Sequence, residues 1–412
     1  MDLNALRADA ARDMAIPRFP DPPAPVRFNF DQGIVDEASL PYAELKAAMA
    51  AVIDEDGGEA LQYLSHRDRS GSASGIYDCR YEELFYGNEA LRREVARWIE
   101  SVQAIPGLGP SNILLTHGTS AVFPLLATAF VNPGEAVLME AMTLGQAEKA
   151  FRMHGARVHK VAIDRNGLVI ADLVRQLEAL KREGIRPKLL YTIPTFHLPT
   201  GSVLPQQRRA ELLALAEQWN MIVVEDSVYS ELRYGGERLP SLWRLDTSGL
   251  VLQVHGFAKI LAPGIRLGWV GGHPDLVGAI AAVRTDFGVS QWMCRAMAKL
   301  MQNGVIHDHV PHVAEVCRLK RDVAVAAVRK HCGQWLDFEA PEGGMYLWLE
   351  MRETVDWEAA LDAARLAGVH LRSGERFRPD GARYLRLAFC HASIEELEEG
   401  IQALGTALRE AG

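Results

Sequence analysis

Short apolar runs alternate with helical stretches through the middle of the chain. Between about residues 112 and 275, the runs that favour strands are ILLTH, AVLME, ARVHKVAI, KLLYTI, MIVVED, LVLQVH and LGWVGG. Strands that alternate with helices form βαβ units, in which helices cover both faces of a parallel sheet. The pattern therefore predicts an α/β fold built on a mostly parallel central sheet.

The segments on either side of this region have other patterns. Five prolines in residues 17–25 favour an extended arm, and the Ser- and Gly-rich residues 64–80 indicate a long loop. Apolar residues recur at helical spacing over 41–53, 88–103 and about 291–331. The runs YLWLEM, GVHLR and YLRLAF, followed by a helix from Ser393, predict a small α+β unit.

These patterns predict a large domain and a small domain that is built from both ends of the chain. We expect an N-terminal arm and part of the small domain in residues 1–45, the large domain in 46–300, and the rest of the small domain in 301–412. A chain of 412 residues is long enough for this division.

Composition and charge argue against several classes of protein. The chain is 48% hydrophobic and 24% charged, which is ordinary for a globular protein. Its net charge is −9 and no run of Lys and Arg occurs, so we expect no nucleic-acid partner. Residues 1–15 lack the apolar core of a signal peptide, and no stretch approaches 18 apolar residues. We therefore expect no membrane span and a cytoplasmic location.

Metal and disulfide chemistry are not indicated either. The five cysteines form no Cys-x-x-Cys pair. His307, His309 and His312 are spaced by two and three residues, whereas a helical zinc site pairs histidines four residues apart. We expect no metal site.

The segment HGFAKILAPGIRLGW (255–269) is the first candidate for chemistry. Lys259 follows a predicted strand and lies between Ala258 and Ile260, so its ammonium is poorly solvated. Desolvation disfavours the charged form, as a lysine that forms a Schiff base requires. Arg266 can supply a forked donor for a phosphate. By itself, the segment is more typical of a surface Lys and Arg on a turn.

Two upstream segments add to this candidate site. In MIVVEDSVY (221–229), Asp226 ends an apolar strand and could hold a pyridinium nitrogen protonated, while Tyr229 could bond a phenolic oxygen. In ILLTHGTSAVFPLL (113–126), the backbone N–H groups of Gly118, Thr119 and Ser120 could form an anion site. Taken singly, the first is also typical of a helix cap, and the second of an ordinary N-cap.

The order of these segments identifies a family. A phosphate turn, an Asp-x-x-Tyr at a strand end, and a Lys with an Arg seven residues on occur in this order in fold-type I enzymes that use pyridoxal 5′-phosphate (PLP). Over about residues 28–410 the chain resembles the class I/II aminotransferases. It is similar to the branch that contains 2-aminoadipate aminotransferases and the aminotransferase-like domains of certain transcription regulators. Further motifs that carry the resemblance are PTFHLPTG (194–201), PEGGMYLWL (341–349) and YLRLAF (384–389).

The resemblance implies a role for each matching residue. Lys259 would form the Schiff base with PLP and then move the proton, Asp226 would pair with the pyridine nitrogen, and Tyr229 would bond the phenolic oxygen. The phosphate would be held by Gly118, Thr119, Ser120, Arg266 and, from the neighbouring subunit, Tyr63. Arg386 would bind the substrate α-carboxylate under a loop that contains Gly33. The resemblance thus implies a homodimer with shared active sites.

Several positions depart from the family pattern. The family usually reads Gln-Asn-Pro-Thr-Gly where this chain has HLPTG, so Leu198 removes a donor to the phenolic oxygen. The family's Ser-x-Ser-Lys is here Gly256-Phe257-Ala258-Lys259, so two hydroxyls near the phosphate are absent. The aromatic ring that normally stacks on the cofactor is replaced near Leu144, and an insertion occupies residues 64–85.

These departures touch the cofactor but not Lys259 or Asp226, so more than one reaction stays open. The leading interpretation is an aminotransferase that acts on an L-amino acid and a 2-oxo acid. A second interpretation keeps PLP but changes the outcome to decarboxylation, oxidative deamination or another carbanion reaction. A third is a non-catalytic effector domain of a PLP-binding regulator. The third is disfavoured because such regulators carry an N-terminal winged helix, and about 27 residues precede the matched region.

Overall fold

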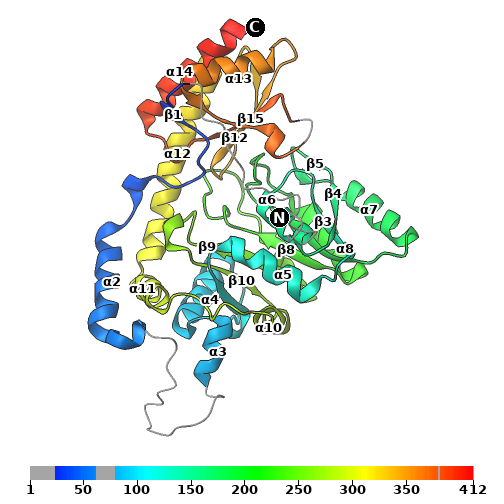
Figure 1. The fold of residues 1–412 in the computed structure, drawn as a ribbon, viewed down its shortest axis with the longest axis vertical. Coiled ribbons are helices and arrows are strands. Elements are labelled where there is room, and N and C mark those ends of the chain that lie inside the picture. The colour runs from blue at the N-terminus through cyan, green and yellow to red at the C-terminus, as the bar shows by residue number, and fades with distance from the viewer. Residues whose placement is uncertain (1–23, 62–78, 379–380, 412) are drawn as a thin grey trace, which may run out of the picture.

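A seven-stranded sheet forms the centre of the fold, and its strands lie in the order β2–β10–β9–β8–β7–β3–β4 (Figure 1). The computed structural model describes residues 24–61, 79–378 and 381–411. Strands β9, β8, β7, β3 and β4 run parallel, and β10 is antiparallel to both of its neighbours, β9 and β2. The strands are β2 (Ile113–Thr116), β3 (Ala136–Glu140), β4 (Arg157–Val161), β7 (Pro187–Thr192), β8 (Ile222–Asp226), β9 (Val251–Gly256) and β10 (Gly268–Gly272).

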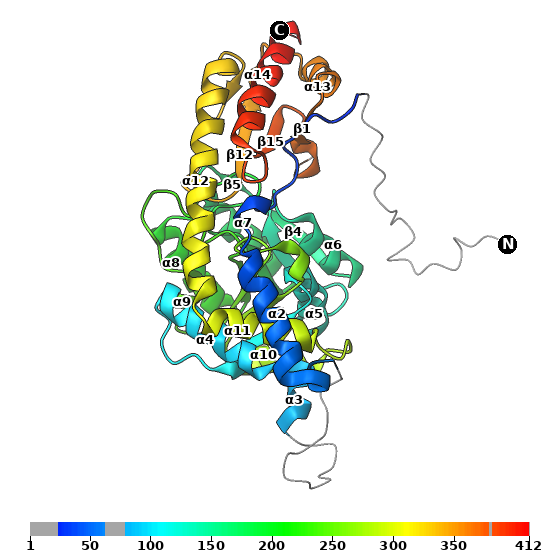
Figure 2. The same cartoon turned by 90° about the vertical axis from the view of Figure 1, so that its left-hand side faces the viewer.

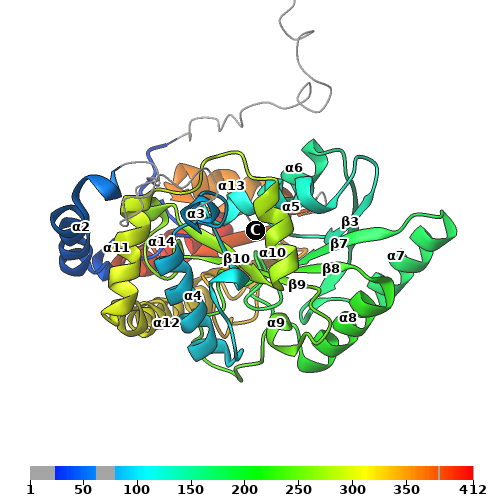
Figure 3. The same cartoon turned by 90° about the horizontal axis from the view of Figure 1, so that it is seen from below.

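Alternate residues of these strands are buried on opposite faces of the sheet. Val137 and Met139 of β3 belong to one apolar cluster, and Ala136 and Leu138 belong to the other. Two layers of helices cover the faces, as Figure 3 shows from below. The first layer is α5 (Val122–Phe130), α6 (Gly145–Met153) and α10 (Pro274–Ala282); the second is α4 (Glu89–Gln103), α7 (Ile170–Arg182), α8 (Gln206–Trp219), α9 (Leu242–Leu245) and α11 (Gln291–Gln302).

A smaller antiparallel sheet lies at the other end of the molecule. Its order is β11–β12–β15–β14, and α13 (Trp357–Leu366) and α14 (Ile394–Ala411) pack beside it (Figure 1). The strands are β11 (Leu336–Asp337), β12 (Tyr346–Met351), β14 (Arg372–Ser373) and β15 (Tyr384–Ala388). The long helix α12 (Val305–His331) runs from α11 to this end of the molecule, beside α14 (Figure 2).

The N-terminal segment joins the C-terminal part of the chain. Strand β1 (Phe28–Asn29) pairs in parallel with β13 (Val369–His370), and the backbone N–H of Ala388 donates to the carbonyl of Phe30 at 2.7 Å. Helix α2 (Tyr42–Asp56) then packs against α11. These contacts agree with a small part built from both ends, and the domain limits near residues 45 and 300 stay a prediction.

The predicted fold class is confirmed, with differences in detail. The helical pattern over 291–331 is two helices, α11 and α12, which are separated by Asn303 and Gly304, whose φ is +77°. The predicted insertion ends in a helix, α3 (Cys79–Tyr86), while residues 64–78 and most of the proline-rich arm lie outside the described residues. No helix of the described residues is long and apolar enough to cross a membrane.

Candidate active site

Asp226 and Tyr229 lie where β8 ends, at the carboxyl edge of the parallel strands. Both side chains are buried. Burial disfavours the carboxylate and raises the pKa of Asp226 to about 6, although a hydrogen bond from Tyr191 and the positive charge of Lys259 oppose this rise. The hydroxyl of Tyr229 lies 3.3 Å from that of Tyr346. Burial and the neighbouring Tyr346 raise the pKa of Tyr229 well above its usual value, so Tyr229 is a neutral phenol that can donate.

Lys259 lies in the turn that follows β9. Its Nζ donates to the carbonyl of Gly33 at 2.6 Å and lies 6.0 Å from the ring centroid of Tyr229. A Cβ on Gly33 would come within 1.9 Å of the Tyr346 hydroxyl, so a side chain at this position would displace the Tyr346 ring. The structure thus brings together the predicted residues Lys259, Asp226, Tyr229 and Gly33.

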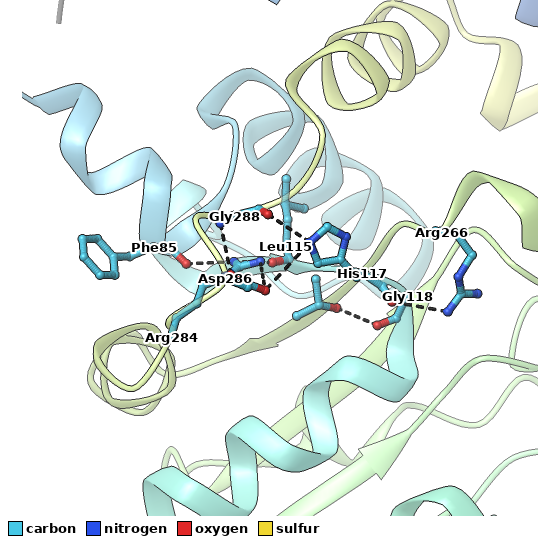
Figure 4. A network of polar contacts seen from close by, with 9 residues as sticks. Phe85, Leu115, His117, Gly118, Arg266, Arg284, Asp286 and Gly288 are labelled. Atoms are coloured by element: carbon cyan, nitrogen blue, oxygen red, sulfur yellow. Dashed lines mark hydrogen bonds and ion pairs between the residues drawn. The ribbon is translucent and has the colours of Figure 1, made fainter. Parts of the chain in front are cut away.

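The predicted phosphate turn faces Arg266. Gly118 has φ +71°, and a short 3-10 turn over Thr119–Ala121 leads from it into α5. Arg266 Nη2 donates to the carbonyl of His117 at 3.3 Å, beside Gly118 (Figure 4). Arg266 Nη1 also donates to the Pro263 carbonyl at 3.3 Å. Arg266 is exposed and has no carboxylate partner among the described residues, so its remaining N–H groups can meet an anion. Thr119 is half-buried and Ser120 is exposed at the same turn.

A buried arginine supports this turn from behind. Arg284 Nη1 donates to the carbonyls of Leu115 at 2.7 Å and Phe85 at 2.9 Å, and its guanidinium pairs with Asp286 (Figure 4). Asp286 accepts from the backbone N–H of Gly288 at 3.1 Å, and the carbonyl of Gly288 lies 2.9 Å from His117 Nε2. Our sequence reasoning missed this network, because its hydrogen bonds join positions up to 199 residues apart.

The absence of a serine at position 256 has a steric reason. Gly256 of β9 pairs with Gly268 of β10, directly beneath Thr119. A Cβ at position 256 would lie 2.9 Å from the Gly268 Cα and 3.0 Å from the Leu267 carbonyl oxygen. A Cβ at position 268 would lie 2.8 Å from the Thr119 nitrogen. The two glycines let the phosphate turn approach the sheet more closely than a side chain allows.

Arg386 lies on β15 and is held by aromatic rings and a carboxylate. Its guanidinium lies 4.5 Å from the ring centroid of Tyr346 and 5.6 Å from that of Phe377. Its Nη2 lies 3.1 Å from Asp31 Oδ1, and Asp31 also accepts from Arg372 on the neighbouring strand β14. Arg386 Nε is buried without a hydrogen-bond partner in the described residues, so the guanidinium can take a further acceptor.

Other positions singled out from the sequence have structural contacts. His197 is fully buried, with Nε2 3.1 Å from Glu140 Oε2 and Nδ1 2.9 Å from Thr200 Oγ1, so it ties the HLPTG segment to β3. Leu198 is buried in the apolar cluster, and Leu144 packs against the same cluster at the start of α6. Tyr63 lies outside the described residues.

Four site residues escaped the sequence reasoning: Tyr191, Asp31, Arg372 and Tyr346. Tyr191 could have been found, because a tyrosine interrupts the mainly apolar run KLLYTI. Its side chain lies on the same face of the sheet as that of Asp226 on the neighbouring strand. Asp31 and Arg372 gave no local signal, because the contact between them joins positions 341 residues apart.

The groups that meet at this site fit the chemistry of PLP. An amine for the aldehyde, a carboxylate for the pyridine nitrogen, and backbone N–H groups with an arginine for the phosphate meet at the carboxyl ends of the strands. The fold and the site therefore define an α/β enzyme of the PLP-dependent kind.

Comparisons with known proteins give the family. The sequence model of "Aminotransferase class I and II" matches residues 84–404, so the chain belongs to this family. Aromatic-amino-acid aminotransferase 1 of Thermococcus litoralis is 32% identical over 382 residues, which cover 92% of this chain and 87% of that protein.

Two solved structures extend the likeness to three dimensions. The multiple substrate aminotransferase of Thermococcus profundus has a TM-score of 0.87 at 28% identity, covering all of this chain and 99% of that one. Pyrococcus horikoshii kynurenine aminotransferase, solved in complex with PMP, also has a TM-score of 0.87, at 26% identity, covering 99% of this chain and 98% of that one.

These findings confirm the predicted family, fold type, cofactor and enzyme class. The protein is a PLP-dependent aminotransferase of fold type I. The two other interpretations, a different PLP reaction and a non-catalytic regulator domain, are not favoured.

Proposed function

We propose that Lys259, Asp226, Tyr229 and Arg386 are the residues that carry out amino transfer from an L-amino acid to a 2-oxo acid. The observation that carries the proposal is that Tyr346 connects Lys259, Tyr229 and Arg386, while Asp226 lies close enough to Lys259 for their charges to interact. The hydroxyl of Tyr346 meets Tyr229, its ring lies under Arg386, and it contacts the Gly33 segment whose carbonyl accepts from Lys259.

Each residue has a task that its surroundings support. When bound, PLP supplies an electron-withdrawing ring that stabilises negative charge at the substrate α-carbon. Lys259 Nζ moves the proton of that carbon, Asp226 keeps a proton on the pyridine nitrogen, and Tyr229 donates to the phenolic oxygen. Gly118, Thr119, Ser120 and Arg266 hold the phosphate, as expected for N–H groups at a helix start and a forked guanidinium.

The substrate side of the site favours an amino acid with an aromatic side chain. Arg386 presents its guanidinium to the α-carboxylate between the rings of Tyr346 and Phe377, and Trp348 packs edge-on against Phe377 with centroids 5.8 Å apart. Aromatic rings pair favourably with one another. The similarity to an aromatic-amino-acid aminotransferase supports the same class of substrate.

A substrate panel tests the proposal. The holoenzyme is given aromatic, aliphatic and acidic L-amino acids with 2-oxoglutarate, and glutamate formation is measured beside carbon dioxide release and oxygen uptake. Glutamate should form fastest with aromatic donors. Arg386→Gln should raise KM about 10-fold or more by removing a charge-assisted hydrogen bond. The control, Arg352→Gln, breaks exposed contacts away from the site, a pair with Asp337 and a hydrogen bond to the Gln334 carbonyl. Carbon dioxide release or oxygen uptake without glutamate would contradict the proposal.

We infer that the working unit is a homodimer in the cytoplasm. Tyr63, which lies outside the described residues, would reach the phosphate of the neighbouring subunit. Closed two-fold dimers are the commonest soluble oligomers, and membership of the family supports this assembly.

A further inference from the structure

Tyr191 lies directly behind Asp226. It is fully buried on β7, the strand beside β8, and its ring packs edge-on against Phe123 with centroids 5.5 Å apart. Its hydroxyl donates to Asp226 Oδ2 at 2.6 Å. Burial and the charge of Asp226 raise the pKa of Tyr191 well above its usual value, so the hydroxyl remains a donor at every pH of interest.

The two carboxylate oxygens of Asp226 have different partners. Oδ2 accepts the short hydrogen bond from Tyr191, while the one donor to Oδ1 in the described part of the chain is the backbone N–H of Val228 at 3.3 Å. A carboxylate oxygen can accept two hydrogen bonds, so Oδ1 keeps room for another donor. Tyr191 therefore fixes the carboxylate plane and leaves one oxygen for a ligand.

The charged groups around Asp226 pull its proton equilibrium in opposite directions. Burial and the negative charge of Glu140, at the end of β3, favour the protonated acid, whereas Lys259 and the Tyr191 hydroxyl favour the carboxylate. Glu140 cannot move away, because it is fully buried and accepts from Thr192 Oγ1 at 2.6 Å and the Ile193 N–H at 3.0 Å. Without Tyr191, the side chains that face Asp226 would favour its protonated form more strongly.

We propose that Tyr191 is a positioning residue for amino transfer, one that keeps Asp226 ionised and turns Oδ1 towards the pyridine nitrogen of PLP. The inference rests on the proposed role of Asp226 and extends it to a second layer of the site. Tyr191 does not touch the cofactor; it acts through the carboxylate, and so its removal should change the pH at which the site works.

The test is Tyr191→Phe, which removes one oxygen atom and keeps the ring that packs on Phe123. Binding of PLP to the cofactor-free protein is measured by fluorescence from pH 5 to pH 9, beside kcat of the holoenzyme. The pH below which affinity falls should rise by about one unit, since one unit of pKa is a 10-fold change in equilibrium and a charge-assisted hydrogen bond is worth about that much. Affinity and kcat should recover towards pH 9.

Tyr234→Phe is the matched control. Tyr234 is a half-buried tyrosine whose hydroxyl donates to the Gly344 carbonyl, away from Asp226. Its pH profile should match that of the parent. An equal loss of affinity at all pH values in Tyr191→Phe would indicate a purely structural role and overturn the inference.

Asp226→Asn separates failure of this inference from failure of the proposed function. If Asp226→Asn binds PLP and turns over like the parent, the role of Asp226 is wrong and the inference falls with it. If Asp226→Asn is impaired but Tyr191→Phe keeps the parent's pH profile, only the inference is wrong. In the double variant, Tyr191→Phe should have no further effect on affinity, because its effect acts through the carboxylate.

Discussion

At the scale of the residue, Asp226 is where function and stability oppose each other. Its burial disfavours the charged form in the cofactor-free protein, and this raises the pKa of Asp226 to about 6. A pyridinium nitrogen would reverse the balance, because it supplies the missing charge partner. The same residue should therefore destabilise the empty protein and stabilise the loaded one.

The pH dependence of unfolding tests this opposition. The pKa of Asp226 is raised from 3.8 to about 6 by folding, so the folded state binds more protons than the unfolded state between about pH 4 and pH 6. Stability from this residue falls as the pH rises through that window. The free energy of unfolding of cofactor-free Asp226→Asn should exceed that of the parent by up to about 3 kcal/mol at pH 8. This difference should vanish near pH 4.

Urea unfolding of both proteins from pH 4 to pH 8 gives this comparison. The holoenzymes serve as the control: with PLP bound, the order should reverse at pH 8. A difference in stability that does not change with pH would show that ionisation of Asp226 is not its cause.

The proposed role of Lys259 can be tested independently of Asp226. Because Lys259 Nζ is the amine that meets Tyr229 and Gly33, Lys259→Ala should lose the PLP adduct that borohydride fixes to the protein, and kcat should fall by about 100-fold or more with loss of the proton-transfer group. Mass spectrometry after borohydride treatment reads out the adduct. Lys299→Ala, which within the described ranges breaks one ion pair, with Glu55, should keep the adduct. An adduct that persists at another lysine would assign the attachment elsewhere.

At the scale of the element, the strands were predictable and their contacts were not. The run MIVVED appears as β8 because four consecutive apolar residues lead into two carboxylates, Glu225 and Asp226, at the sheet edge, a purely local signal. The pairing of Gly256 with Gly268 depends on β10 turning back antiparallel to β9, which no local pattern encodes. Likewise, Arg386 was predicted from its motif, but its partner Asp31 lies 355 positions away.

The glycine pair of β9 and β10 can be tested directly. Gly256→Ser restores the family's usual residue, yet its Cβ would lie 2.9 Å from the Gly268 Cα. Backbone at that distance must shift, so we expect a loss of about 1–3 kcal/mol in the free energy of unfolding and weaker PLP binding.

Ala258→Ser is the matched control, because it restores the other hydroxyl at a half-buried position that already has a Cβ. Its free energy of unfolding should stay within about 0.5 kcal/mol of the parent. Tighter PLP binding by Gly256→Ser at unchanged stability would show that the two strands can separate at no cost.

At the scale of the whole molecule, the N-terminal segment contacts the large and the small part of the chain beside the site. Its strand β1 pairs with β13, its Gly33 carbonyl meets Lys259 after β9, and Asp36 accepts from Lys320 of α12 at 2.7 Å. The substrate-carboxylate residue Arg386 and the lysine thus come together through a segment that contacts both parts of the chain. A site assembled in this way can take a further residue from a second subunit.

Hybrid dimers test whether it does. Tyr63→Phe alone should weaken PLP binding about 10-fold or more, as expected for loss of a hydrogen bond to a charged phosphate.

In a dimer of one Lys259→Ala subunit and one Tyr63→Phe subunit, sharing across the interface would place both substitutions in one site and leave the other intact. The hybrid should then show half the parent's kcat and the parent's PLP affinity. If Tyr63 instead binds the phosphate in its own subunit, each site carries one substitution. The one site that keeps Lys259 then carries Tyr63→Phe, so the hybrid would show the weakened PLP affinity of that variant. Differently tagged subunits, mixed and purified by both tags, distinguish the two outcomes in one titration, and an active monomer in sedimentation would exclude sharing altogether.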